Sequence, residues 1–285
     1  MAVIPRKAAL LVLTALAMLL VHPHASPAAG QPPSLFAQTA QAALDHEFPS
    51  GSISYILLDA RSSRVLAERW PHADQPIPVG SLIKPFTALA YARGHRQFPT
   101  VVCNGERDSC WLPRGHGRIT LTTAIAQSCN AYFLTLARDV SVDDANAVLA
   151  DYDLPPVDGA NKSLALAGLS NNWQVAPLTL ARAYAAFARD SRDRDPQIWT
   201  GMRESAQLGT ARAVNVALPT RSALAKTGTA RCTHSPRGAA DGFTIVLYPA
   251  DDPRIVLLTR VHGVTGATTA ATAAQMIRTL EFGQP

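Results

Sequence analysis

The pattern of hydrophobic and polar residues divides the chain beyond residue 50 into strand-like and helix-like stretches. Residues 52–58 and 64–68 are rich in β-forming residues, and the polar segment between them is typical of a hairpin turn. From residue 81 to about residue 202, apolar residues recur at intervals of three and four, which predicts amphipathic helices. These helices are expected at residues 86–93, 121–137, 142–149 and 178–188.

The C-terminal part of the chain returns to a strand-like pattern. Residues 222–229, 242–248 and 255–261 are candidate strands, and residues 268–280 predict a closing helix. Strands from both ends of the chain can pair in one antiparallel sheet while the intervening helices form a separate lobe. The predicted fold class is therefore α+β: an antiparallel sheet flanked by helices, with an inserted all-helical lobe and a cleft where the two meet. The sheet lobe is expected at about residues 50–80 and 215–285, and the helical lobe at about residues 81–214.

The first 28 residues have the pattern of a secretory signal peptide. Arg6 and Lys7 precede an apolar run at residues 8–21, and small residues surround Ala28. We expect cleavage near Ala28, which leaves residues 29–285 as one domain in the periplasm or outside the cell. The apolar run is short for a membrane span, and an uncleaved N-terminal membrane anchor is the alternative.

Composition and charge argue against a nucleic-acid partner. Hydrophobic residues make up 47% of the chain, which is enough to form a core without a framework of disulfides. Without Arg6 and Lys7 the formal net charge falls from +5 to +3, and the arginines are scattered. A chain with no basic stripe is not expected to bind nucleic acid, whereas a weakly basic surface is compatible with an acidic cell-wall polymer.

The cysteines and histidines form none of the usual metal motifs. The sequence contains no Cys-x-x-Cys and no His-Glu-x-x-His, so we expect neither a metal nor a cofactor. Cys103 and Cys110 share one loop and could form a disulfide, while Cys129 and Cys232 are expected to be buried thiols. His116 lies between two glycines and is expected to support its loop by hydrogen bonding.

Lysine is rare in this chain, and its positions are informative. The sequence has only four lysines against 22 arginines, and two of them occur in short polar motifs. The three motifs of interest are Ser81-Leu-Ile-Lys84, Ser128-Cys-Asn130 and Lys226-Thr-Gly228, placed by the pattern on a helix start, an inter-helix turn and a strand. Each motif alone is compatible with a helix cap, a surface residue or a strand end. All three in this order favour a catalytic site.

A lysine at position 84 can lose its proton, whereas an arginine there could not. A buried arginine stays protonated, whereas a lysine amine becomes neutral when it is desolvated or placed beside another cation. On a helix, the amine of Lys84 can reach the hydroxyl of Ser81 one turn back, where a neutral amine could take the serine proton. The free N–H groups at the start of that helix would favour a negative oxygen.

These motifs resemble those of the penicillin-binding transpeptidases, the acyl-serine family that also contains the serine β-lactamases. The resemblance extends over about residues 50–282 and is greatest to elongation-type members, although the chain leaves no room for their N-terminal pedestal or for a glycosyltransferase. Besides the three motifs, it includes residues 84–90, 110–111, 115–117, 124–133, 175–181, 209–211 and 226–230. It implies the transpeptidase-like fold of that family.

The resemblance also implies roles for individual residues. Ser81 would attack the carbonyl of a D-alanyl-D-alanine terminus, with Lys84 as general base. Ser128 would pass a proton to the leaving amine, and the backbone N–H groups of Ser81 and Thr229 would form the oxyanion hole. The remaining assignments are Asn130 and Lys226 in the polar network and Thr227, Gly228 and Thr229 in substrate binding. The acyl-enzyme would pass to a second peptide's amine or to water, giving transpeptidase or carboxypeptidase activity on peptidoglycan stem peptides.

Other ligands and functions follow from the same resemblance. β-Lactams would act as inhibitors, and cell-wall synthesis proteins are possible partners. A serine β-lactamase is one alternative, but the Glu-x-x-x-Asn element of class A and the Tyr-Gly-Asn of class D are missing from the sequence. A non-catalytic β-lactam sensor or scaffold is a second alternative, since a fold does not by itself fix a function. An intact set of motif serines and lysines favours the enzyme.

Overall fold

The computed structural model describes residues 34–192, 195–218, 222–233 and 240–282. The predicted signal peptide, residues 1–28, lies outside the described residues. Among the helices in these ranges, none has both the length and the apolar character that crossing a membrane would require.

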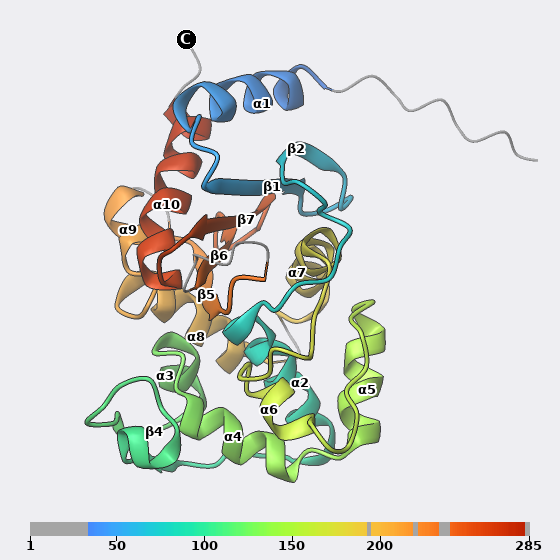
Figure 1. The fold of residues 1–285 in the computed structure, drawn as a ribbon, viewed down its shortest axis with the longest axis vertical. Coiled ribbons are helices and arrows are strands. Elements are labelled where there is room, and N and C mark those ends of the chain that lie inside the picture. Colours follow the sequence, from blue (N-terminus) through green and yellow to red (C-terminus); the bar gives the residue numbers. More distant parts are fainter. Residues whose placement is uncertain (1–33, 193–194, 219–221, 234–239, 283–285) are drawn as a thin grey trace, which may run out of the picture. The chain divides into compact units, whose positions relative to one another are not determined.

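Five antiparallel strands form the central sheet, with two strands from the N-terminal part of the chain and three from the C-terminal part (Figure 1). Their order across the sheet is β2-β1-β7-β6-β5, so the N-terminal and C-terminal groups of strands meet where β1 pairs with β7. The strands are β1 (Ile53–Asp59), β2 (Val65–Arg69), β5 (Leu224–Ala230), β6 (Asp241–Tyr248) and β7 (Ile255–His262). This arrangement confirms the predicted fold class.

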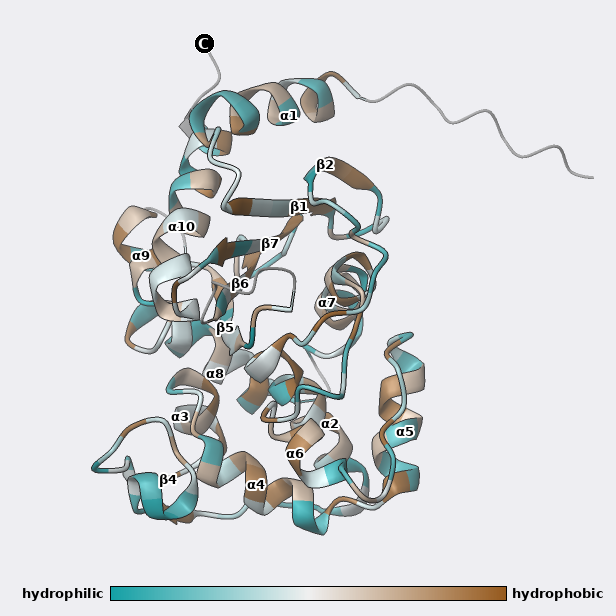
Figure 2. Cartoon of the chain, in the orientation of Figure 1, coloured by the Kyte–Doolittle hydropathy of each residue, from teal (hydrophilic) through white to brown (hydrophobic). Residues whose placement is uncertain are grey.

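Both faces of the sheet are buried, and alternation along each strand decides which core a side chain joins. On β6, Phe243 and Ile245 pack into the core shared with the helical lobe, whereas Val246 and Tyr248 pack on the opposite face. Figure 2 shows hydrophobic residues along the sheet strands, while the segment beside β4 is largely hydrophilic. A sheet with two buried faces explains why its strands read as nearly continuous apolar runs.

Three helices cover the face of the sheet that lies away from the helical lobe: α1 (Leu35–Glu47), α9 (Ala213–Ala217) and α10 (Gly266–Phe282). The helix predicted at residues 268–280 corresponds to α10. The sequence pattern did not predict α1, whose buried side chains are only Ala37, Ala40 and Leu44. The Ser34 hydroxyl caps this helix by accepting a hydrogen bond from the N–H of Ala37 at 3.2 Å.

The inserted segment between β2 and β5 is mainly helical. Its elements before α9 are η1 (Gly80–Ile83), α2 (Lys84–Gly94), β3 (Val101–Cys103), η2 (Gly105–Asp108), β4 (Gly117–Ile119), α3 (Leu121–Ala126), α4 (Asn130–Asp139), α5 (Val142–Asp151), α6 (Lys162–Leu166), α7 (Pro177–Asp190) and α8 (Pro196–Gln207). The helix predicted at residues 121–137 is in fact two helices, α3 and α4, which are separated by a turn at residues 127–129. The helix α8 contacts both α3 and strand β5 and so joins the two layers.

A cluster of buried aromatic rings connects the helix after η1 to the helices that cover the sheet. Phe86 of α2 meets Tyr184 of α7 edge to face, with ring centroids 5.1 Å apart. Phe187 of α7 lies 6.0 Å from Phe86 and 6.1 Å from Trp199 of α8. The Tyr184 hydroxyl donates a hydrogen bond to the backbone oxygen of Leu82 in η1 at 2.6 Å, so this cluster also fixes the segment that carries Ser81.

We expect Phe187→Ala to lower the free energy of unfolding by about 3–5 kcal/mol, because it removes a fully buried ring and leaves a cavity between three helices. Urea denaturation followed by circular dichroism measures this change. Val216→Ala, at a side chain that is 81% exposed, is the control and should change stability by about 0.5 kcal/mol or less. Equal, small effects of both substitutions would contradict the central role of the aromatic cluster.

Candidate active site

Ser81 lies in the short 3₁₀ helix η1, immediately before α2 begins at Lys84. The neighbouring side chains Leu82 and Ile83 are fully buried, whereas Ser81 is partly exposed. In a 3₁₀ turn, side chains three residues apart lie over one another, so Ser81 and Lys84 lie on the same side of the segment. The spacing of the first motif therefore places both residues on one side of the segment, although the turn is tighter than the predicted helix start.

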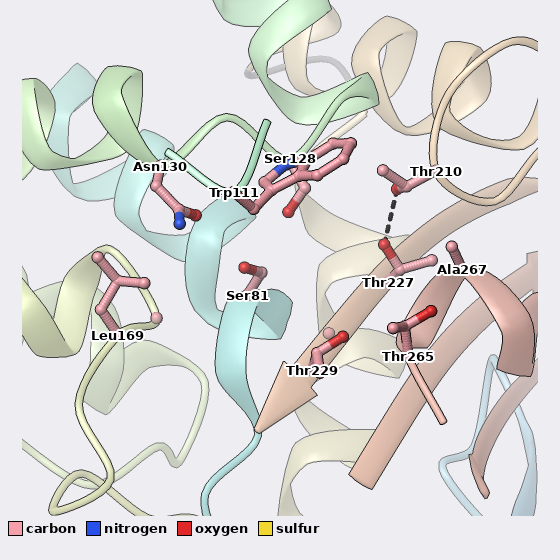
Figure 3. A pocket seen from close by; sticks show the side chains of 12 residues that line it. Ser81, Trp111, Ser128, Asn130, Leu169, Thr210, Thr227, Thr229, Thr265 and Ala267 are labelled. Atoms are coloured by element: carbon pink, nitrogen blue, oxygen red, sulfur yellow. Dashed lines mark hydrogen bonds between the residues drawn. The ribbon is translucent and has the colours of Figure 1, made fainter. Parts of the chain in front are cut away.

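Gly80 brings the start of η1 against the backbone of strand β5. Its φ of +58° lies in the left-handed region, and a Cβ atom at this position would come within 2.3 Å of the backbone oxygen of Thr229. Only glycine tolerates both conditions. As a result, Ser81 and Thr229 line the same pocket, although they are far apart in the sequence (Figure 3).

The Lys84 amine is buried at the bottom of the site and makes short hydrogen bonds to the second motif. It donates to the backbone oxygen of Ser128 at 2.8 Å and to Oδ1 of Asn130 at 2.7 Å. The Ser128 hydroxyl lies 3.4 Å from the same nitrogen. Among the described residues, the hydrogen bonds of this amine therefore go to Ser128 and Asn130 and not to Ser81, which differs from the sequence expectation.

Burial controls the charge of Lys84. The side chain is 0% exposed, and desolvation lowers its pKa from 10.5 to about 7, although the nearby sulfurs of Cys129 and Cys110 act in the opposite direction. Within the described residues, Lys84 has no carboxylate partner. The neutral amine is thus a substantial fraction of the population near neutral pH, which an arginine at this position would not allow.

Ser128 and Asn130 are held at the turn between α3 and α4. Ser128 has a φ of +53°, which is unusual for a residue other than glycine. Backbone hydrogen bonds hold this turn, from the N–H of Ser128 to Ile125 at 3.2 Å and from the N–H of Cys129 to Ala124 at 2.9 Å. The conformation turns the Ser128 hydroxyl toward both buried lysines. The break in the predicted helix is therefore what presents the second motif to the site.

Lys226 approaches Ser128 from the opposite side. Its Nζ donates to the Ser128 hydroxyl at 2.8 Å and to the backbone oxygen of Thr227 at 2.8 Å. Burial lowers the pKa of Lys226 well below its usual value, and repulsion from Lys84 lowers it further. One serine hydroxyl thus lies between two buried amines that disfavour each other's protonation, an arrangement that can pass a proton along three side chains.

A pocket of about 330 Å³ opens above these residues. Figure 3 shows Ser81, Ser128 and Asn130 on its helical side and Thr227 and Thr229 on strand β5. Its lining consists of Ser81, Trp111, Ser128, Asn130, Gly168, Leu169, Thr210, Thr227, Gly228, Thr229, Thr265 and Ala267. Strand β5 is an edge strand of the described sheet, so its outer edge can pair with an extended peptide in the pocket.

The structure brings together all the residues that the three motifs predicted and adds several that they did not. Trp111 and Leu169 form apolar parts of the pocket lining, and Thr265 and Ala267 come from the segment around the start of α10. Thr210 shares a hydrogen bond of 2.6 Å with Thr227. Trp111 and Thr210 lie in segments that belong to the family resemblance, but nothing in their spacing indicated a position in the pocket.

The disulfide considered for Cys103 and Cys110 is not formed, because both are free thiols in the structure. Each sulfur instead lies 3.5 Å from Nδ1 of His116, and Cys110 is also 3.9 Å from the sulfur of Cys129. The contact between these two sulfurs lowers the pKa of Cys110 and raises that of Cys129, because one thiol can share its proton with the other's thiolate. His116 supports its loop through these thiols.

A comparison with known protein families matches most of the described chain to one family model. The family model for the penicillin-binding protein transpeptidase domain matches residues 54–280. No curated protein sequence matches the chain.

Solved structures share the fold at low sequence identity. Pseudomonas aeruginosa PBP2, solved in complex with WCK 5153, has a TM-score of 0.73 at 18% identity over 86% of this chain and 77% of its own. The PBP2 of Helicobacter pylori in complex with MreC has a TM-score of 0.71 at 14% identity over 86% of this chain and 63% of its own. The transpeptidase domain of Burkholderia pseudomallei penicillin-binding protein 3 has a TM-score of 0.67 at 19% identity over 88% of this chain and 95% of its own.

The charge state of Lys84 can be measured directly, because the chain has only four lysines. In protein labelled with ¹³C at the lysine Cε, we expect the resonance of Lys84 to titrate with a midpoint of about 7 and that of Lys226 also well below its usual value, since burial disfavours both protonated amines. Lys84→Met should remove the Lys84 resonance, and Lys162→Met, which removes a lysine outside the three motifs, should leave it unchanged. If the resonance lost in Lys84→Met titrates near 10.5, the inferred burial of the amine is wrong.

Proposed function

Because this chain belongs to the penicillin-binding protein transpeptidase domain family, we propose that it is a serine acyltransferase that acts on peptidoglycan stem peptides. Its substrate would be a D-alanyl-D-alanine terminus, and its intermediate an ester on Ser81. The observation that carries this proposal is the pair of buried amines, Lys84 and Lys226, on either side of the Ser128 hydroxyl in the pocket that Ser81 lines.

The hydrogen bonds of Lys84 support its role as general base. A neutral amine has two N–H groups and one lone pair, and the two short bonds to Ser128 and Asn130 use both N–H groups. The lone pair would then accept the proton of Ser81 as its oxygen attacks the substrate carbonyl. The two bonds hold the amine beside the pocket, and its hydrogen bond with Ser81 would form when the substrate binds.

The later steps use Ser128 and Lys226. The tetrahedral oxygen would accept hydrogen bonds from the backbone N–H groups of Ser81 and Thr229, which usually lower a barrier by about 3–4 kcal/mol per donor. As the peptide bond breaks, the leaving D-alanine amine takes a proton from Ser128, and the proton held on Lys84 replaces it through the 3.4 Å contact. Lys226 holds the Ser128 oxygen in place throughout, and Thr227 and Thr229 bind the peptide along β5.

The composition of the pocket favours acyl transfer over rapid hydrolysis. Of the described residues that line it, none is an aspartate or a glutamate. A serine β-lactamase must activate water against its acyl-enzyme, and a carboxylate is a common base for that step. We therefore infer that the acyl-enzyme persists until an amine, or slowly water, resolves it.

The setting of this reaction follows from the same proposal. An N-terminal signal peptide would place the domain in the periplasm or outside the cell, where stem peptides are accessible. The solved relative from Helicobacter pylori forms a complex with MreC, which supports a search for a cell-wall synthesis partner of this chain.

We expect benzylpenicillin to form a persistent covalent adduct with the purified protein. Intact-mass spectrometry should show one adduct per chain, mapped by proteolysis to the peptide that contains Ser81. Ser81→Ala should abolish the adduct. Ser163→Ala, which deletes a serine hydroxyl in α6, is the control and should still form it. Rapid turnover of nitrocefin without a persistent adduct would contradict the proposal in favour of a β-lactamase.

Acylation should also depend on the proton of Lys84. Below pH 7 the amine is increasingly protonated and cannot accept a proton, so the rate should fall as the pH drops through about 7 and level off above it. Lys84→Arg keeps the positive charge but cannot provide a neutral base, and we expect no acylation at any of these pH values. Lys162→Arg is the matched control and should acylate at the normal rate. A normal rate in Lys84→Arg would mean that another group is the base.

A further inference from the structure

Among the described residues, the lining of the active-site pocket contains no arginine, lysine or histidine. Its polar side chains are the amide of Asn130 and the hydroxyls of Ser81, Ser128 and four threonines. The amines of Lys84 and Lys226 do not belong to this lining and are 0% exposed. A negative group on a ligand must therefore be held by hydroxyl and backbone N–H donors.

A hydroxyl group holds an anion only when its proton points toward that anion. It has one proton and two lone pairs, so it donates to a ligand when its partners inside the protein donate to it. A hydroxyl whose proton is already used inside the protein presents only lone pairs, which repel a carboxylate. The direction of each hydrogen bond along the pocket wall therefore decides which ligand groups the wall accepts.

For Thr229 this direction is fixed by the backbone. Its Oγ1 accepts a hydrogen bond at 2.9 Å from the N–H of Gly266, the first residue of α10, and this is the hydrogen bond of that side chain within the described ranges. A backbone N–H can only donate, so the proton of Thr229 remains for the pocket. Gly266 is held against β5, because a Cβ atom there would come within 2.3 Å of the backbone oxygen of Gly228. The Thr244 hydroxyl also donates to the backbone oxygen of Gly266 at 3.0 Å.

For Thr227 the direction depends on Thr210. The two Oγ1 atoms are 2.6 Å apart, and either hydroxyl can be the donor (Figure 3). If Thr227 donates, the acceptor left for the proton of Thr210 in the described part of the chain is the backbone oxygen of Ala126, at 3.4 Å. If Thr210 donates, its proton makes the short bond and the proton of Thr227 is available to the pocket. An anion in the pocket can only accept hydrogen bonds, so it selects the second arrangement.

The end of α3 holds Thr210 in place. The N–H of Thr210 donates to the backbone oxygen of Ala126 at 3.0 Å. A Cβ atom at Gly209 would lie 2.1 Å from the same oxygen, so only glycine allows the chain to pass this close to α3. Ala126 directly precedes the turn at residues 127–129, which presents the second motif. Thr210 therefore joins the element that carries the second motif to the strand that carries Thr227.

The proposed reaction would place the C-terminal carboxylate of the peptide beside these hydroxyls. A single carbon atom joins that carboxylate to the leaving nitrogen, which would take its proton from Ser128. Lys226 connects Ser128 to β5, because its Nζ donates to the Ser128 hydroxyl and to the backbone oxygen of Thr227, both at 2.8 Å. The carboxylate would therefore lie next to β5, within reach of Thr227 and Thr229.

We propose that Thr210 is a positioning residue: it donates to Thr227, so that Thr227 and Thr229 form a pair of donors for the C-terminal carboxylate of the peptide. This assignment rests on the proposed function, which supplies the ligand. A hydroxyl that accepts one hydrogen bond becomes a stronger donor in the next, because successive hydrogen bonds polarise one another. Thr210 thus acts on the carboxylate through Thr227.

Binding can be measured without acylation in Ser81→Ala, which keeps the pocket but has no nucleophile. The probes are Nα,Nε-diacetyl-L-lysyl-D-alanyl-D-alanine and its C-terminal methyl ester, and titration followed by ligand-detected NMR gives a dissociation constant for each. The ester accepts hydrogen bonds but has no charge, and hydrogen bonds to a charged acceptor are about twice as strong. We expect the acid to bind more tightly than the ester.

Thr210→Val, added to Ser81→Ala, keeps the shape of the side chain and removes its hydroxyl. We expect it to lower the preference for the acid over the ester by about three- to tenfold, because the carboxylate loses a polarised donor. Thr210→Ser keeps the hydroxyl and should restore the preference. Thr200→Val, which removes an exposed threonine hydroxyl from α8, is the matched control and should leave the preference unchanged. A loss of packing alone would weaken the acid and the ester alike.

Three results would overturn the proposal. They are an unchanged preference in Thr210→Val, equal weakening of both probes in that variant, and a parent Ser81→Ala protein that binds the acid no better than the ester. Penicillin labelling of the protein with Ser81 intact separates these results from failure of the proposed function. An adduct on Ser81 together with an unchanged preference in Thr210→Val would refute only the role of Thr210, whereas the absence of any adduct would refute the acyl-enzyme.

Discussion

The structure depends on the burial of two lysine amines around one serine hydroxyl. Lys84 and Lys226 are both 0% exposed, both contact Ser128, and neither has a carboxylate partner among the described residues. Two charged amines in such a place would be costly, so at least one is held neutral. The chain provides one amine from α2, the other from β5, and the hydroxyl from the turn between α3 and α4. The junction of sheet and helical lobe is the place where these three elements meet.

This arrangement has a cost in local structure. Ser128 adopts a left-handed backbone conformation, and the turn around it interrupts what the apolar pattern would otherwise make a single helix. Such conformations persist only where the surroundings determine them, and they cluster at functional sites. Here the surroundings include the bond from Lys84 to the backbone oxygen of Ser128, the bond from Trp111 to that of Gln127, and the contact between the sulfurs of Cys110 and Cys129.

The sheet and the aromatic cluster provide the rigid frame for the nucleophile. Gly80 packs on the backbone of β5, while Tyr184 holds the backbone oxygen of Leu82 on the other side of Ser81. The nucleophile is thus fixed to the sheet on one side and to α7 on the other. A site held by regular elements keeps its geometry without the substrate, which reduces reorganisation during the reaction. Strand β5, at the edge of the described sheet, forms one wall of the pocket.

The sequence by itself determined the class of fold, the five strands within a few residues of their ends, and the three motifs of the site. It could do so because these features are local: strand periodicity, helical spacing and short combinations of reactive residues are all visible within a few positions. The scarcity of lysine added a chemical reason for positions 84 and 226. The sequence pattern did not predict helix α1, because its buried face consists of only two alanines and one leucine.

Only the tertiary structure decided which residues meet across the cleft. The hydrogen bonds of Lys84 to Ser128 and Asn130 join positions more than 40 residues apart, and no pattern along the chain fixes such a contact. The same holds for Cys103 and Cys110, for which the sequence suggested a disulfide and whose sulfurs instead both lie beside His116. Long-range contacts depend on how two layers pack and on where a strained turn places a side chain, and both are properties of the assembled core.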